Sequence, residues 1–187
     1  MKLYLDEHID SLDLQAGLAA VGEERRRYAL RYRRERDQRL CVSAWLLLQR
    51  ALRECYGLAQ LPPIVRGVRG KPALEGFEHI YFNLSHCRLA AACVVDDHPV
   101  GVDVECIDRY DPLLLSRTMS TGEQRLIAAA PLPAEQFVRL WTMKESLLKL
   151  TGEGLRNDLA SVLNHADNYV FTTSKHAGWL CTVCQAR

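Results

Sequence analysis

Two stretches of this sequence place acidic and basic side chains at spacings that suit a metal ion and a phosphate group. In residues 100–105, Asp103 and Glu105 alternate with valines, so in a strand both carboxylates lie on one face, about 6–7 Å apart. In residues 141–149, Glu145 precedes Lys149 by four positions, which places both on one helix face. Mg²⁺ prefers carboxylate oxygens and takes further oxygens from substrate phosphates. The three carboxylates are therefore candidate magnesium ligands.

Each stretch also has a simpler interpretation, which the spacing leaves open. A glutamate four residues before a lysine is a common ion pair that stabilises a helix by about 0.2–0.5 kcal/mol. Two acids on one face of a strand are also typical of an exposed edge strand. Trp141 shares the helix face of Glu145 and Lys149 and could simply pack that helix into place.

Lysine is rare in this chain, and its positions favour the phosphate interpretation. Of the five lysines, Lys144 and Lys149 lie in residues 141–149 and Lys71 lies in the turn Gly70-Lys71-Pro72. An ammonium is a compact charge that can approach a phosphoryl oxygen without the planar fork of arginine. With Arg39 and His86, these lysines are candidates to hold phosphates.

The elements that must position these side chains follow from hydrophobic spacing. Apolar residues recur every three or four positions across 36–56 and 134–150, which predicts two long helices. Residues 23–30 are expected to form a shorter basic helix, and Ser120 and Glu123 have the spacing of a capping box at the start of another. Strands are predicted at 2–5, 64–68, 79–84, 89–95, 100–107, 159–163, 169–173 and 179–185, with a hairpin turn at 96–99.

The order strand, helices, paired strands occurs once before Pro99 and once after it. This faint repeat, in a chain of 187 residues, predicts one domain or two small, closely packed lobes. We divide the chain into an N-terminal lobe, residues 1–99, and a C-terminal lobe, residues 100–187.

Composition indicates an ordinary globular protein with one unusual cluster. The chain is 48% hydrophobic and 25% charged, as is typical of globular domains. It contains neither an apolar run long enough to cross a membrane nor a signal-peptide core, so we expect a cytoplasmic protein with no membrane partner. The net charge is only +1, yet nine arginines lie within residues 23–50. They predict an anionic partner, such as nucleic acid, a polyphosphate ligand or an acidic protein, or else a solvated arginine-rich surface.

The seven cysteines are odd in number and scattered, and no secretion signal accompanies them. We expect them to be reduced core residues. Cys181 and Cys184 have the spacing of a zinc or redox pair, but in a strand residues three apart point to opposite faces. The spacing therefore does not indicate a zinc site.

Four segments together resemble the 4′-phosphopantetheinyl transferase superfamily, in its surfactin-synthetase-activating (Sfp) type. They are Gly70-Lys71-Pro72, Phe82-Asn83-Leu84-Ser85-His86, Gly101-Val102-Asp103-Val104-Glu105, and residues 141–155, WTMKESLLKLTGEGL. Each run is short, but their order and separations are specific. The resemblance covers residue 23 to the C-terminus.

The resemblance implies a fold and a reaction. The fold is α+β, with two similar lobes related by a pseudo-two-fold axis, each a small, mostly antiparallel sheet packed with helices, and the active site at the lobe interface. The implied enzyme transfers 4′-phosphopantetheine from coenzyme A to a serine of an apo acyl or peptidyl carrier protein, with Mg²⁺ as cofactor, and releases 3′,5′-ADP. Residues 1–99 would bind coenzyme A and residues 100–187 would bind magnesium. We expect a monomer with no nucleic-acid partner.

The resemblance also implies roles for individual residues. Asp103, Glu105 and Glu145 would be the metal ligands. Glu145 would accept the proton of the carrier serine, with a pKa depressed by Mg²⁺ and Lys149, while Lys149 and His86 would be the other catalytic residues.

Coenzyme A would be bound by a further set of residues: Arg39 and Lys71 near the 3′-phosphate, Ser85 in a binding loop, and His86 and Lys149 at the phosphates. Arg27 and Arg36 are alternatives to Arg39. Leu113, Leu114 and Leu115, with the remaining arginines, are candidates for docking the carrier, or else belong to the core.

Two rival functions stay open beside the resemblance. One is a nucleic-acid-binding module built on the arginines, although no aromatic interleaving or nucleic-acid motif accompanies them. The other is a different magnesium phosphotransferase or nuclease. Which carrier protein would be modified is also open.

Overall fold

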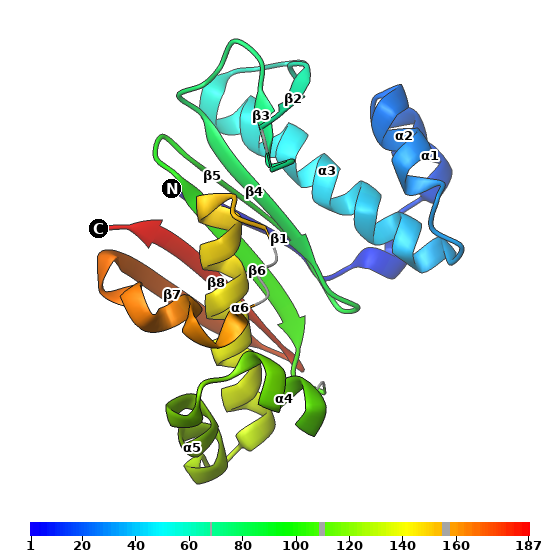
Figure 1. Cartoon of the computed structure of the whole chain (residues 1–187). Coiled ribbons are helices and arrows are strands. Elements are labelled where there is room, and N and C mark those ends of the chain that lie inside the picture. The colour runs from blue at the N-terminus through cyan, green and yellow to red at the C-terminus, as the bar shows by residue number, and fades with distance from the viewer. Residues whose placement is uncertain (68, 109–110, 155–157) are drawn as a thin grey trace.

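The computed structural model describes residues 1–67, 69–108, 111–154 and 158–187. The chain is α+β, as predicted, and contains two three-stranded antiparallel sheets that each pack against a long helix (Figure 1).

The first sheet contains β1 (Lys2–Asp6), β4 (Tyr81–His86) and β5 (Ala91–Asp96), in the order β1-β5-β4. Helix α3 (Glu35–Tyr56) packs against it and confirms the helix predicted at 36–56. Its buried residues, Leu40, Ala44, Leu48 and others at helical spacing, form a common core with Ala91, Cys93 and Val95 of β5. The helix ends at Gly57, whose φ of +68° is unfavourable for residues with a side chain.

Smaller elements complete this part of the chain. They are η1 (Ile9–Ser11), α1 (Leu14–Ala20), α2 (Glu23–Ala29), β2 (Ile64–Arg66) and β3 (Pro72–Leu74). Helices α1 and α2 lie on the side of α3 that faces away from the second sheet (Figure 1). The strand predicted at 64–68 is present as β2, while Val68 lies outside the described residues.

The second sheet contains β6 (Val100–Cys106), β7 (Tyr169–His176) and β8 (Trp179–Ala186), in the order β6-β8-β7. Helix α6 (Pro133–Thr151) covers one face, where Leu147 and Leu148 pack near Phe171 and Cys184. Helices α4 (Pro112–Thr118) and α5 (Thr121–Ala129) and η2 (Leu159–Asn168) surround α6. The predicted capping box at the start of α5 is confirmed.

The other face of the second sheet packs against the first sheet. Val100, Val102 and Val104 share an apolar cluster with Ala92 and Val94 of β5. The predicted alternation in β6 is therefore confirmed, and its polar face is turned toward α6. The interpretation of β6 as an exposed edge strand is wrong, because Asp103 is only 3% exposed.

Two other predictions are wrong. Residues 159–163 belong to the 3₁₀-helix η2 and not to a strand. Residues 96–99 connect β5 to β6 but form no hairpin, because β5 pairs on both edges with β1 and β4, while β6 pairs with β8 in the other sheet.

The cysteines behave as predicted in the described part of the chain. Cys181 lies in the cluster between the sheets and Cys184 lies under α6, on opposite faces of β8. All seven cysteines are free, and burial raises the pKa of Cys181 and of Cys184 to about 12. None of the described helices has the length and apolar character needed to span a membrane.

Candidate active site

The arginine-rich helices border a groove of about 1330 Å³, which we call the basic groove. It is lined by residues of α2, α3, the segment 58–66, the end of β4 and α6. The lining cations are Arg25, Arg27, Arg31, Arg53, Arg66 and Lys149, which outnumber the lining acids, Glu23 and Glu24. A concave surface with this excess of positive charge favours a polyanionic ligand.

Arg25 is fixed within the groove by aromatic rings. Its guanidinium carbon lies 4.6 Å from the Trp45 ring centroid and 5.0 Å from that of Tyr28, and one of its NH₂ groups donates to the Cys41 carbonyl. The Arg25 Nε is buried without a hydrogen-bond partner. Sequence reasoning did not single out Arg25, although its spacing of three from Tyr28 on α2 places the two side chains together.

At one end of the groove, three side chains from three elements meet. The Lys149 ammonium donates to Ser85 Oγ at 2.9 Å and to Asp103 Oδ1 at 2.6 Å. The Ser85 hydroxyl donates to the same Asp103 oxygen at 2.9 Å and accepts the Val104 N–H at 3.2 Å. Among the described ion pairs, Lys149 thus pairs with Asp103 of β6 and not with Glu145 of its own helix. The simple helix ion pair is therefore not what this lysine forms.

Two carboxylates at this contact, Asp103 and Glu145, are only partly compensated. Asp103 Oδ2 is buried and has no hydrogen-bond partner. Burial and the neighbouring Asp103 raise the pKa of Glu145, and Lys149 opposes this only in part. The predicted depression of this pKa by Lys149 is thus outweighed by burial. Glu105 is half-buried on the same face of β6.

The structure brings some of the predicted metal ligands together but no complete metal site. Asp103 and Glu145 are close enough to influence each other electrostatically. Within the described ranges, however, no group of three or more His, Cys, Asp or Glu side chains is arranged to hold a metal ion. A cation bound here would need further oxygens from a ligand or from water.

His86 and Ser85 both line the basic groove, and both lie in β4 and not in a loop after it. The His86 pKa is lowered, first because surrounding protein reduces hydration of the imidazolium and second because Lys149 is nearby. The residue is nevertheless solvent-exposed and lines the groove. It is therefore a neutral imidazole at pH 7, available as a hydrogen-bonding group.

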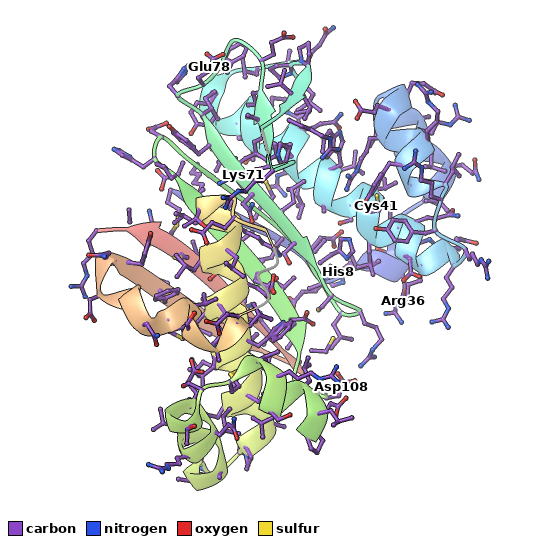
Figure 2. All side chains as sticks on the ribbon, in the orientation of Figure 1. His8, Arg36, Cys41, Lys71, Glu78 and Asp108 are labelled. Carbon is purple, nitrogen blue, oxygen red and sulfur yellow. The ribbon has the colours of Figure 1, made fainter. Side chains whose placement is uncertain are left out.

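Lys71 and Arg39 lie outside the lining of the basic groove. Lys71 Nζ donates to the Leu150 carbonyl at 2.7 Å and its side chain packs over Gly152, at the C-terminal end of α6 (Figure 2). Arg39 donates to the Asp10 carbonyl and pairs with Glu35, beside a separate hollow of about 490 Å³. Of the alternatives, Arg27 lines the basic groove.

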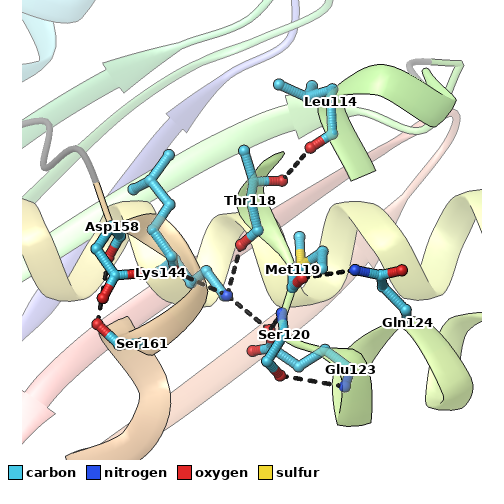
Figure 3. A network of polar contacts seen from close by, with 10 residues as sticks. Leu114, Thr118, Met119, Ser120, Glu123, Gln124, Lys144, Asp158 and Ser161 are labelled. Atoms are coloured by element: carbon cyan, nitrogen blue, oxygen red, sulfur yellow. Dashed lines mark hydrogen bonds and ion pairs between the residues drawn. The ribbon is translucent and has the colours of Figure 1, made fainter. Parts of the chain in front are cut away.

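Lys144 is not a phosphate contact. It is 1% exposed, and its ammonium donates to the Thr118 carbonyl, the Glu123 carboxylate and the Leu159 carbonyl, at 2.7–2.9 Å (Figure 3). It thereby fastens α4, α5 and η2 to α6. Trp141, one turn before Glu145, stacks on Phe137 with centroids 6.3 Å apart, which confirms a packing role.

The leucines proposed for carrier docking divide between surface and core. Leu113 is 67% exposed on α4, whereas Leu114 and Leu115 pack against the cluster formed by α5, α6 and β8. Leu126 of α5 is 60% exposed as well. The apolar surface of α4 and α5 is therefore smaller than the three consecutive leucines suggest.

Comparison with known proteins gives one consistent result. Residues 99–184 match the family model described as "4'-phosphopantetheinyl transferase superfamily". Over 144 residues, 75% of this chain, the sequence is 33% identical to the 4'-phosphopantetheinyl transferase psf-1 of Bacillus pumilus, of which it covers 62%. It is 30% identical to a 4'-phosphopantetheinyl transferase of Bacillus subtilis over 85% of this chain and 72% of the relative. With 4'-phosphopantetheinyl transferase Sfp of Bacillus subtilis (strain 168) it shares 23% identity over 98% of this chain and 90% of the relative.

Proposed function

We propose that this chain, which belongs to the 4′-phosphopantetheinyl transferase superfamily, transfers 4′-phosphopantetheine from coenzyme A to a serine of an apo acyl or peptidyl carrier protein. The co-product is 3′,5′-ADP. The active site lies where the two lobes, residues 1–99 and residues 100–187, meet, and the chain acts as a cytoplasmic monomer.

One observation carries the proposal. Lys149 belongs to the basic groove and at the same time contacts the buried Asp103, so the anion-binding surface and the carboxylates share one side chain. Coenzyme A carries a pyrophosphate and a 3′-phosphate, which suit the arginines of α2 and α3. A nucleic-acid-binding module would have no use for buried carboxylates beside its groove.

The carboxylates fit a magnesium ion. Asp103 Oδ2 has no hydrogen-bond partner, and Glu145 is disfavoured as an anion by burial and by Asp103. A cation between β6 and α6 would relieve both. Mg²⁺ usually takes one or two carboxylates and completes its shell with substrate phosphates and waters, so Asp103 and Glu145 would hold it, with Glu105 as the third acid. When bound, Mg²⁺ would offset the charge that develops on the departing 3′,5′-ADP.

The chain's own residues then have distinct tasks. The groove arginines hold the anionic coenzyme, and Lys149 reaches the pyrophosphate from the inner end of the groove. His86, neutral at pH 7, hydrogen-bonds the phosphates. Glu145 accepts the proton of the carrier serine. Lys71 acts on the site indirectly by fastening the end of α6, and Arg39 by fastening the start of α3.

Mass spectrometry tests the proposal. The chain is incubated with coenzyme A, Mg²⁺ and a panel of apo carrier proteins from fatty-acid, polyketide and nonribosomal-peptide systems. We expect one carrier to gain the mass of a phosphopantetheine group and Glu145→Gln to abolish the gain while coenzyme binding persists. Lys175→Met is a matched control, because Lys175 lies on β7 and pairs with Glu135 at the surface. No gain with any carrier, or unchanged turnover by Glu145→Gln, would contradict the proposal or the role of Glu145.

A further inference from the structure

The two sheets are joined beside the candidate active site by side chains. The Val102 N–H of β6 donates to Asn83 Oδ1 at 3.0 Å, and the Val104 N–H donates to Ser85 Oγ at 3.2 Å. Both contacts link residues 19 positions apart, so β4 and β6 run side by side in the same direction. Each strand has its backbone partner in its own sheet, β5 for β4 and β8 for β6. Asn83 and Ser85 therefore satisfy amides on the otherwise open edge of β6.

These two amides flank Asp103. Fixing the residues before and after it fixes the position of its backbone and the direction of its side chain toward Lys149 and α6. Ser85 is itself tied to Lys149 and Asp103, so a ligand that displaces Lys149 also disturbs Ser85. Asn83 holds the strand without contacting either of them, and it is 7% exposed and outside the lining of the basic groove.

We propose that Asn83 is a positioning residue for the transfer reaction: its side-chain carbonyl holds Val102, and through it β6, so that Asp103 keeps its place between Lys149 and Glu145. Its importance for turnover rests on the proposed function, whereas the hydrogen bond itself can be tested without any activity. Asn83 is buried and outside the lining of the basic groove, so we expect it to touch neither coenzyme nor carrier. Its loss is therefore expected to lower kcat and to leave the KM for coenzyme A nearly unchanged.

The experiment compares three variants with wild type. Asn83→Leu keeps the approximate size of the side chain but removes the acceptor, whereas Asn83→Asp keeps an acceptor at the same position. Gln185→Leu is the matched control, since the Gln185 amide joins the two sheets by donating to Asp96 of β5 and not to Asn83. Amide hydrogen exchange at Val102 and Val104, the unfolding temperature, kcat and KM are measured for each.

In Asn83→Leu we expect the Val102 amide hydrogen to exchange at least about tenfold faster than in wild type, because this buried amide has lost its acceptor. We expect its kcat to fall about tenfold, as for a small displacement of a catalytic group, with a KM within about twofold of wild type. Asn83→Asp should recover most of both properties. Gln185→Leu should leave Val102 exchange and kcat unchanged. If Asn83→Leu does not fold, Asn83→Ala replaces it, because alanine adds no bulk.

Three results would overturn the proposal: wild-type exchange at Val102 in the Asn83→Leu protein, an equal loss of kcat in Asn83→Asp, or an equal loss in Gln185→Leu. The exchange rate at Val102 is measured without turnover, so it tests the Asn83 hydrogen bond even if the wild-type chain modifies no carrier. Absence of transfer by wild type would instead contradict the proposed function.

Discussion

Replacing Gly101 with alanine should push α6 and β6 apart. A Cβ at Gly101 would lie 2.0 Å from the Ser146 carbonyl oxygen and 2.7 Å from the Leu150 N. Both atoms belong to the backbone of α6, so no side-chain rotation can relieve the contact. The two backbones must move apart by at least 1 Å to bring the closer contact to the 3.0 Å that real Cβ atoms reach.

The cost of this displacement can be estimated. Overpacking of a close contact typically costs about 1–3 kcal/mol, and here the top of that range is expected because the opposing atoms are backbone. The same movement stretches the 2.6 Å contact between Lys149 and Asp103 beyond hydrogen-bonding distance. A displacement of about 1 Å at a reacting centre can lower turnover about 100-fold.

The assay measures urea denaturation and phosphopantetheine transfer for Gly101→Ala, with Gly122→Ala as control. A Cβ at Gly122 would lie 4.0 Å from its nearest neighbour, Ser120 Oγ, and alanine favours the α5 helix by about 0.5–1 kcal/mol. Gly122→Ala should therefore be as stable as wild type or more so, and equally active. Wild-type stability and turnover in Gly101→Ala would refute the idea that this glycine sets the distance between α6 and β6.

Three further predictions concern charged groups on α6. The folded-state pKa of Glu145 is raised above its unfolded value, so the stability tied to its protonated form is present at low pH and lost as pH rises. Glu145→Gln should therefore unfold at a higher temperature than wild type at pH 7 and at the same temperature near pH 4. A lower unfolding temperature of Glu145→Gln at pH 7 would contradict this. In electron paramagnetic resonance titrations without coenzyme A, Lys149→Met should bind Mn²⁺ about tenfold more tightly than wild type, because the ammonium that neutralises Asp103 is gone. Lys149→Arg should show no gain. Equal Mn²⁺ affinity of Lys149→Met and wild type would refute competition between the Lys149 ammonium and the metal ion for Asp103. Lys144→Met should lose about 3–5 kcal/mol in urea denaturation, because the largely enclosed Glu123 carboxylate loses its ammonium partner. Adding Glu123→Gln should restore part of the loss, and full additivity of the two substitutions would contradict the pairing.

Predictions that rest on local periodicity were the reliable ones. The alternation of valine with Gly101, Asp103 and Glu105 correctly gave the two faces of β6, because side-chain direction in a strand depends only on residue parity. The two wrong predictions have different causes. Residues 96–99 have hairpin chemistry, but β1, from the far end of the chain, occupies the edge of β5 that a hairpin partner would need. Residues 159–163 form an apolar run too short to distinguish a strand from a helical turn.

The candidate site shows the same division at the level of single residues. Lys144 and Lys149 have the same side chain and lie on the same helix, and residue type alone suits both to a phosphate, although the resemblance assigns that role to Lys149. Five residues of helix turn them about 140° apart, so at most one can face β6. The backbone contact of α6 at Gly101 fixes the rotation of the helix, which directs Lys149 into the groove and Lys144 into the protein beside Glu123. Spacing shows that the two lysines point in different directions, but only the packing of α6 on β6 shows which of them faces the basic groove.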